Sequence, residues 1–211
     1  MRRRRVANAW RYEAGGLILD RVGTYATSLA RRLGKDVKVI VDDNGLRFAA
    51  ATWAPLWATI VHAVRNAVDH GLEPAEERLA NNKPGTGQLT FTTRLEGDAL
   101  VITVVDDGRG VNWELLALKG KPLGLSAHEV LFADGISSRD TVSDISGRGV
   151  GLGALRDACT ARDGSVEVRD GQAGGTVVEI RIPRAQHVVR TIDIVDRDEA
   201  AHVASASALA H

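Results

Sequence analysis

The chain has 211 residues and a mass of 22.6 kDa, which suffices for one domain with a hydrophobic core of its own. Its 27 Lys and Arg residues balance 27 Asp and Glu residues, and this zero net charge argues against a broad nucleic-acid-binding face. The single cysteine, Cys159, excludes an internal disulfide and a cysteine-based zinc site, and it fits a reducing cytoplasm.

The first residues include a basic run, Arg2 to Arg5, which is expected to be solvated. The apolar stretch that comes next, 17–19, is closed by Asp20 and is too short for a signal peptide. No apolar run approaches the roughly 20 residues that cross a bilayer. We therefore expect a cytoplasmic protein without direct membrane insertion, and we interpret residues 1–15 as a basic linker.

Hydrophobic periodicity predicts the elements of the first half of the chain. Apolar residues at helical spacing predict a helix over 16–33, which Gly34 ends. A β-branched run over 37–41, followed by a turn, predicts a strand whose hairpin partner is a short strand over 46–48. Two further helices are expected over 51–70 and 74–79.

In the second half, the apolar period changes to two after Gly87, which predicts a hairpin with strands over 89–93 and 100–104. Residues 108–148 hold six glycines and little sustained period, apart from a short helix near His128, and a connection of this length is typical of a functional lid. The remaining expected elements are a helix over 149–161, strands over 165–168 and 176–182, and a tail or the start of a linker over 184–211. This order predicts an α+β domain over 16–183, with a helical layer on a mostly antiparallel sheet.

The helix expected over 51–70 has an apolar side and an unusual polar side. At about 100° per residue, its apolar side should face the core, and it comprises Trp57, Ile60, Val61, Val64 and Val68. The opposite side comprises His62, Asn66, Asp69 and His70, with Arg65 at its margin. These are short hydrogen-bonding and metal-binding groups rather than the long charged side chains of a solvated surface, although they also suit a local capping network.

Two glycine-containing segments offer further binding groups. The strand that ends at Asp106 runs into Asp107-Gly108-Arg109-Gly110, where a carboxylate at a strand end and close backbone approach suit a flat ligand. The segment 146–152 enters a helix and presents free amide groups to an anion such as phosphate.

Other phosphate-binding motifs fit less well. A P-loop is excluded because no G-x-x-x-x-G-K-[ST] sequence occurs. The relaxed dinucleotide pattern over 149–154, with Asp170 downstream, lacks the preceding buried strand and the repeated strand-helix-strand units that it requires.

The polar helix and the two glycine segments, in this order, resemble the N, G1 and G2 boxes of the GHKL ATPases. The sequence H-A-V-R-N-A-V-D-H-G over 62–71 closely resembles the N box of CheA-type chemotaxis histidine kinases, and S-G-R-G-V-G over 146–151 resembles their G2 box. Phe132, Ser137 and Ser138 lie in a segment that resembles the F box, and Gly174-Gly175-Thr176 resembles the last glycine box.

The resemblance implies a Bergerat-type two-layer α/β sandwich with an ATP lid, and it implies ATP and Mg²⁺ as cofactors. It implies a catalytic role for His62 and Arg65 in phosphoryl transfer, Asn66 as a ligand of Mg²⁺, and Asp106 as the acceptor for the adenine amine. The implied ATP-binding residues are Asn66, Asp69, His70, Asp106, Gly108, Gly110, Gly147, Arg148, Gly149, Val150, Gly151, Leu152 and Thr176.

Kinases of this type also carry a phosphoacceptor histidine domain, a dimerisation helix pair and a coupling domain, none of which is seen in this sequence. The implied partners are therefore a histidine-containing phosphotransfer domain in trans and a response regulator, with a coupling protein and receptors reached through other domains. In the F-box segment, Asp134 replaces the usual Pro and Ile136 the usual Phe.

Three functions stay open from the sequence. The first is an ATP-dependent protein-histidine kinase domain that phosphorylates a separate acceptor. The second is a nucleotide-binding regulatory module whose altered lid does not support transfer. The third is a GHKL ATPase that activates water with a glutamate, which is disfavoured because His62 stands one turn before Asn66 where that glutamate belongs.

Overall fold

A computed structural model describes residues 12–133 and 151–191 of the chain. Its elements are, in order, β1 (Tyr12–Ala14), α1 (Gly15–Arg32), β2 (Val37–Asp42), β3 (Leu46–Ala49), α2 (Ala50–Asn66), the π-helical turn η2 (Ala67–Gly71), α3 (Ala75–Ala80), β4 (Gly87–Glu96), β5 (Ala99–Asp106), α4 (Trp113–Gly120), the 3₁₀ turn η3 (Lys121–Leu123), α5 (Ala127–Leu131), α6 (Leu152–Thr160), β6 (Ser165–Asp170), β7 (Thr176–Ile182) and β8 (Val188–Arg190).

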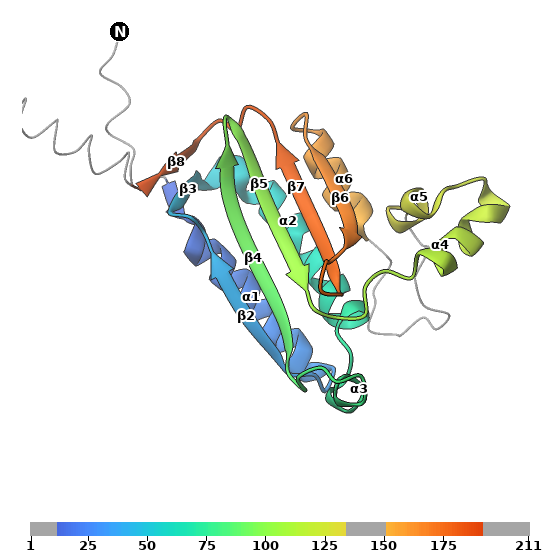
Figure 1. Cartoon of the computed structure of the whole chain (residues 1–211). Helices are drawn as coiled ribbons and strands as arrows, with labels where there is room; N and C mark the ends of the chain where they lie inside the picture. The colour runs from blue at the N-terminus through green and yellow to red at the C-terminus, as the bar shows by residue number, and fades with distance from the viewer. Residues whose placement is uncertain (1–11, 134–150, 192–211) are drawn as a thin grey trace, which may run out of the picture.

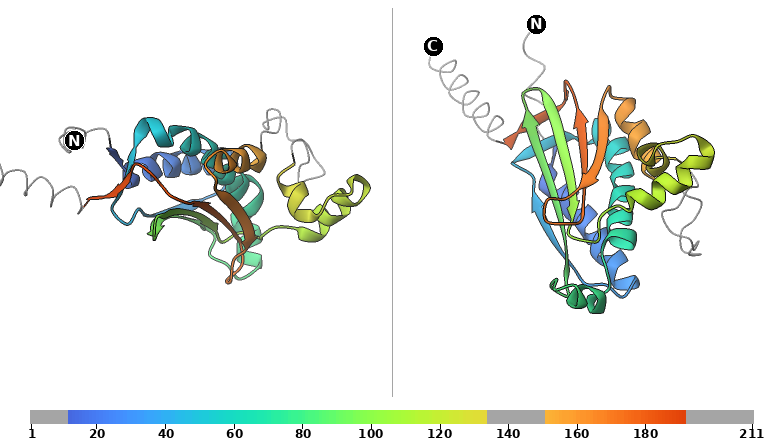
Figure 2. Two further views of the ribbon diagram at one scale, coloured as in Figure 1. Left: turned by 90° about the horizontal axis from the view of Figure 1, so that it is seen from above. Right: turned by 45° about the vertical axis from the view of Figure 1, so that its right-hand side comes forward.

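The domain is a two-layer α+β sandwich, as predicted. A five-stranded sheet has the order β2-β4-β5-β7-β6, and only the β2–β4 pair is parallel. Helices α1, α2 and α6 lie together against one face of this sheet (Figures 1 and 2). The predicted hairpin β4–β5 is confirmed, and so is the antiparallel pairing of β6 with β7.

The predicted hairpin between residues 37–41 and 46–48 is wrong. Strand β2 pairs in parallel with β4, from Val37 opposite Gly87 to Asp42 opposite Thr92. Strand β3 instead lies between β1 and β8 in a separate three-stranded sheet. Secondary structure therefore extends past both predicted boundaries, 16 and 183. The turn at 42–45 carries the chain from one sheet to the other rather than folding it back.

The core lies between the five-stranded sheet and the helices. The apolar side of α2 supplies Trp57, Ile60 and Val64, all buried, as the sequence predicts, while Val61 is only partly buried. Phe48 of β3 packs edge-on against Trp53 and Trp57, with ring centroids 5.8 and 5.1 Å apart. The start of α2 is thereby fixed to the small sheet, and its last turns project toward the end of β5.

Part of the predicted lid segment 108–148 is helical: α5 is the short helix expected near His128, whereas α4 was not predicted. Helix α4 buries only Leu116 and Gly120, and α5 buries only Val130, so neither has a long apolar stripe. The Trp113 indole N–H donates to Asp170 Oδ2 at 2.8 Å, and its ring stacks on His128 at 4.5 Å. His128 is exposed but joins α5 to α4 through this stack, and the α4–α5 unit projects beside the sheet (Figure 1).

None of the helices within 12–133 and 151–191 combines the length and the apolar character that crossing a lipid bilayer requires.

Candidate functional site

The predicted polar residues lie at the end of α2 and on the turn that follows it. His62, Arg65 and Asn66 are on the last turns of α2 and are partly buried. Asp69 and His70 are on η2, where the Leu72 amide donates to the Ala67 carbonyl at 2.7 Å in an i to i+5 bond. Such π turns interrupt α-helices often at functional sites, and this one brings the chain directly to the end of β5.

A buried lysine holds this π turn from behind. Lys35, which is 8% exposed, donates from Nζ to the carbonyl oxygens of Val68, Asp69 and Leu72, each at 2.8 Å. These carbonyls lie at the C-terminal end of the helix, where the helix dipole favours a cation. Lys35 therefore sets the course of the backbone that carries Asp69 and His70.

Asp106 is the central carboxylate of the site. It is the last residue of β5 and is only 4% exposed. Its Oδ1 accepts from the Gly108 amide at 2.9 Å and from the Thr176 amide at 3.2 Å. The predicted residues Asp106, Gly108 and Thr176 are thus together, because β5 and β7 are neighbouring antiparallel strands.

Glycines surround Asp106 where a side chain would not fit. A Cβ on Gly71 would lie 3.1 Å from Asp106 Oδ1, and one on Gly108 would lie 2.2 Å from the Gly71 carbonyl oxygen. A Cβ on Gly175, in the turn between β6 and β7, would likewise overlap the Asp106 carbonyl oxygen. Gly110, with φ +79°, lies beside Gly175 and Asp170 instead. The end of the N-box segment and the segment after β5 therefore meet backbone to backbone.

Two titratable groups of the site have displaced pKa values. Burial raises the pKa of Asp106 to about 6, against the opposing effect of the hydrogen bonds from Gly108 and Thr176. Burial, helped by the charge of Arg65, lowers the pKa of His62 from its ordinary value. His62 is therefore neutral at pH 7 and able to accept a proton, and Asp106 becomes ionised only as neutral pH is approached.

The described residues of the segments that resemble the G2 and F boxes lie at the start of α6 and at the end of α5. Gly151 precedes the first residue of α6, Leu152, which is buried. Phe132 at the end of α5 is 8% exposed, and the Arg156 guanidinium of α6 lies 5.3 Å from its ring centroid. The remaining predicted site residues, Gly147, Arg148, Gly149, Val150, Ser137 and Ser138, lie outside the described residues, as do Asp134 and Ile136.

The described residues fit ATP and Mg²⁺ in their chemistry. The buried Asp106 carboxylate, bordered by glycines that leave no room for side chains, suits a flat base with an amino group. Across 12–133 and 151–191, no three His, Cys, Asp or Glu side chains gather as a metal site. Mg²⁺ held by one protein oxygen, the Asn66 amide, and by phosphate oxygens agrees with this, because the ion is commonly bound through substrate phosphates.

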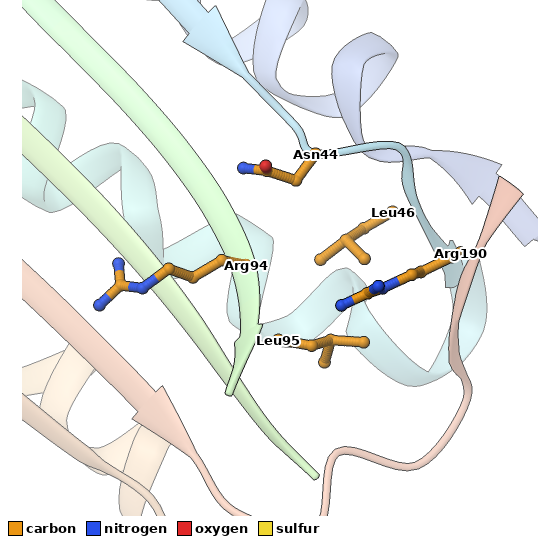
Figure 3. A pocket seen from close by; sticks show the side chains of 5 residues that line it. All are labelled: Asn44, Leu46, Arg94, Leu95 and Arg190. Carbon is orange, nitrogen blue, oxygen red and sulfur yellow. The ribbon is translucent and has the colours of Figure 1, made fainter. Parts of the chain in front are cut away.

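A separate cavity of about 260 Å³ lies away from these residues (Figure 3). Its lining consists of Asn44, Leu46, Arg94, Leu95 and Arg190. Leu95 pairs with Leu100 at the start of β5, whereas Asp106 ends that strand opposite Leu89. The cavity is therefore at the opposite end of the β4–β5 hairpin and contains none of the predicted site residues.

Sequence reasoning assigned no role to several residues that support the site. Lys35 gave no signal because its partners are backbone carbonyls. Glu73 and Arg78 lie in the segment after the N box, where they form a buried ion pair 3.0 Å long, and Lys83 bonds Glu73 at 2.8 Å. Ion pairs of this kind produce no periodic pattern in the sequence. Charged residues that follow closely after a glycine turn are nevertheless a sequence signal that could have pointed to them.

Comparisons with known proteins agree with this geometry. The family described as "Histidine kinase-, DNA gyrase B-, and HSP90-like ATPase" matches residues 54–186. The chemotaxis protein CheA of Treponema pallidum is 31% identical over 82% of this chain and 22% of its own length. CheA of Bacillus subtilis is 31% identical over 86% of this chain and 29% of its own. The chain thus spans about a quarter of the length of these curated relatives.

Among solved structures, the catalytic domain of histidine kinase ThkA aligns with a TM-score of 0.53 and 15% identity, covering 82% of this chain and 95% of that one. At this identity the likeness is one of fold. The matched residues 54–186 include the end of α2, the Asp106 turn and the described part of the G2 box. The chain belongs to the histidine kinase-, DNA gyrase B- and HSP90-like ATPase family.

Proposed function

We propose that this domain binds ATP with Mg²⁺ and transfers the γ-phosphoryl group to a histidine on a separate phosphotransfer domain. The observation that carries the proposal is Asp106, a carboxylate 4% exposed at the end of β5, with Gly71 and Gly108 packed around it. An acceptor in such a position recognises the amino group of adenine. The similarity to CheA proteins supports a histidine as the phosphoryl acceptor.

In this proposal each end of the ATP molecule, the adenine base and the triphosphate, has its own binding group. Asp106 accepts from the adenine amine, and Asn66 ligates Mg²⁺, which neutralises phosphate charge and so favours transfer. Arg65, Asp69 and His70 support the phosphates and the water shell of the metal. The amides that enter α6, from Gly147 to Leu152, hold the phosphates, and Gly110 and Thr176 border the base.

The transfer step needs a proton acceptor, and His62 is suited to it. The acceptor imidazole nitrogen attacks the γ-phosphorus, the bond to the β–γ bridging oxygen breaks, and ADP leaves. The attacking nitrogen carries no proton, and the proton on the other ring nitrogen of the acceptor passes to His62, whose pKa is lowered by burial and by Arg65. Because the transition state of phosphoryl transfer is loose, positioning and charge neutralisation supply most of the catalysis.

The implied partners follow from this reaction. We infer that the phosphotransfer domain passes the phosphoryl group to a response regulator, and that a coupling protein and receptors act through other domains of a longer kinase.

The single thiol, Cys159, is buried and burial raises its pKa to about 11, which leaves it unreactive at neutral pH. A cytoplasmic location suits a phosphorelay of this kind.

The first test is a calorimetric titration of ATP, with and without Mg²⁺, on the wild type, Asp106→Asn and Asp163→Asn. Asp163 pairs with Arg184 on the surface and serves as the matched control. We expect micromolar binding that falls at least about tenfold in Asp106→Asn, because a carboxylate acceptor is lost, and is unchanged in the control. An Asn66→Ala variant should bind ATP equally well with and without Mg²⁺.

The second test follows labelled γ-phosphate onto an added histidine phosphotransfer domain. We expect transfer by the wild type and a loss of about 10²-fold or more in His62→Gln, which removes the general base. Binding without transfer would identify a regulatory module instead of a kinase. Undiminished transfer by His62→Gln would remove the proposed role of this histidine.

A further inference from the structure

A partly buried cluster of charged side chains lies beside the turn that follows Asp106. It consists of Glu73, Arg78, Lys83 and Asp107. Glu73 and Arg78 are 4% and 1% exposed, and they come from the loop before α3 and from α3 itself. Helix α3 lies at the edge of the domain beside the start of β4 (Figure 1). Two cations and two carboxylates balance each other there, as buried charges require.

Arg78 donates hydrogen bonds to Glu73, to the loop after α3 and to Asp107. Its Nε donates to the Pro84 carbonyl at 2.7 Å, Nη1 to Glu73 Oε2 at 3.0 Å, and Nη2 to Asp107 Oδ2 at 2.7 Å. Nη1 also reaches the Asp107 carbonyl at 3.4 Å. Burial alone would raise the pKa of Glu73, but hydrogen bonds and charge from Lys83 and Arg78 hold it below its ordinary value. Glu73 is therefore ionised at neutral pH.

Lys83 donates hydrogen bonds to the backbone as well as to Glu73. Its Nζ donates to Glu73 Oε1 at 2.8 Å, to the Asp107 carbonyl at 3.1 Å and to the Gly108 carbonyl at 2.7 Å. An ion-paired cluster that only stabilised the fold would need no contact with these two carbonyls. Two successive peptide groups after Asp106 are thus fixed in direction by one ammonium group.

The direction of the Asp107 carbonyl decides where the next amide points. The peptide between Asp107 and Gly108 is planar and trans, so its carbonyl and its N–H point in opposite directions. With the carbonyl held by Lys83 and Arg78, the Gly108 N–H points to Asp106 Oδ1, 2.9 Å away. The charged cluster therefore acts on the Asp106 carboxylate through one peptide plane.

From this chain of contacts we infer that Lys83 and Arg78 are positioning residues for base recognition, aiming the Asp106 carboxylate by holding the Asp107–Gly108 peptide. The inference rests on the proposed function, because it assigns the cluster to selection of adenine over guanine. An aimed carboxylate accepts from the 6-amino group of adenine, whereas guanine presents a carbonyl oxygen there and is repelled.

The test uses Lys83, because Arg78→Met would remove a partner from the buried Glu73 carboxylate, in the part of the cluster that is closed to solvent, and so endanger the fold. The Lys83 side chain is 28% exposed, so Lys83→Met is tolerable. Lys83→Arg keeps donors for the carbonyls and serves as the conservative variant. Lys38→Met, on the exposed side of β2, is the control.

The first readout is the ratio of the dissociation constants for GTP and ATP. We expect Lys83→Met to lower this ratio about tenfold, the value of a hydrogen bond to a charged group, and Lys83→Arg to restore much of it. In an Asp106→Asn background the same substitution should have no further effect, since the residue acts through Asp106. Equal weakening of both nucleotides, or additive effects in the double variant, would mean a structural role only and would overturn the inference.

The second readout does not depend on nucleotide binding. Amide hydrogen exchange at Gly108 in the free protein should rise about tenfold or more in Lys83→Met, while the slowest-exchanging amides of β5 stay unchanged. If the wild type binds no ATP, the proposed function fails and this measurement still decides the positioning role. Unchanged exchange at Gly108 would refute that role.

Discussion

At the scale of single residues, the protonation of Asp106 makes both the stability of the fold and the binding of nucleotide depend on pH. Its pKa of about 6 lies above the ordinary value of 3.8 because the carboxyl is buried. The folded state therefore holds this proton more tightly than the unfolded state. Its contribution to the free energy of unfolding is present below pH 3.8 and is lost as pH rises through 6, by about 3 kcal/mol in all.

The same pKa predicts how nucleotide affinity depends on pH. A protonated Asp106 is a poorer acceptor for the adenine amine, so the affinity for ATP should fall about tenfold per pH unit below pH 6. Titrations at several values between pH 5 and 7.5 measure this. Asp106→Asn should show only the pH dependence of ATP itself, and identical profiles for the two proteins would contradict the assignment.

Gly108 is predicted to tolerate no side chain. A Cβ there would meet the Gly71 carbonyl oxygen at 2.2 Å, a backbone atom that a side-chain rotation does not move. We expect Gly108→Ala to lower the free energy of unfolding by about 2 kcal/mol and to abolish ATP binding. Gly85→Ala is the control, because a Cβ there makes only ordinary contacts at 3.7 Å or more. Urea denaturation and calorimetry measure the two effects.

The residues that form the centre of the site were predictable, and those that support it were not. Asp106 and Gly108 stood out because they occur at a strand end that runs into glycines, Thr176 through the resemblance of 174–176 to a family motif, and the fold brings the three into contact. Lys35 and Lys83 were missed because both bond carbonyls far along the chain, from 24 to 37 positions away. Contacts of this kind depend on the fold and leave no local pattern.

At the scale of elements, α2 and its π turn depend on Lys35. Lys35→Met would leave the carbonyls of Val68, Asp69 and Leu72 without this donor in a buried place. We expect the free energy of unfolding to fall by about 3 kcal/mol, with weaker ATP binding because Asp69 and His70 move. Lys38→Met, at an exposed position of β2, should change neither quantity. A loss of stability equal in both variants would contradict the role of Lys35.

The elements themselves were predicted where they bury a long stripe or alternate regularly. Helix α2 and the β4–β5 hairpin have such patterns, and both are confirmed. Helix α4 buries too few residues to show one. The hairpin between β2 and β3 was predicted wrongly because a turn sequence indicates that the chain changes direction. It does not indicate which sheet the next strand joins. The chain between β2 and β4 contains β3, α2, η2 and α3, a crossover long enough for the parallel pairing.

At the scale of the whole molecule, the small sheet sets the extent of the stable domain. Strand β3 pairs with β1 on one side and β8 on the other. A chain cut to the predicted boundaries, 16–183, loses both partners and exposes Leu46 and Phe48, which are buried. We expect its Tm to lie roughly 5–10 °C below that of residues 12–191, measured by calorimetry. Equal Tm values would show that the small sheet adds nothing to stability.

The small sheet also constrains when this domain can fold during synthesis. The Thr191 hydroxyl bonds the Gly45 carbonyl across 146 positions of sequence, beside the β3–β8 pair. While the ribosome extends the chain, β3 and the start of α2 therefore wait for almost all the described residues to emerge. Contacts of such long separation form slowly, so the nascent chain exposes Phe48 and Trp53 until translation has passed residue 191. Chaperones that bind apolar segments would meet this region for longest.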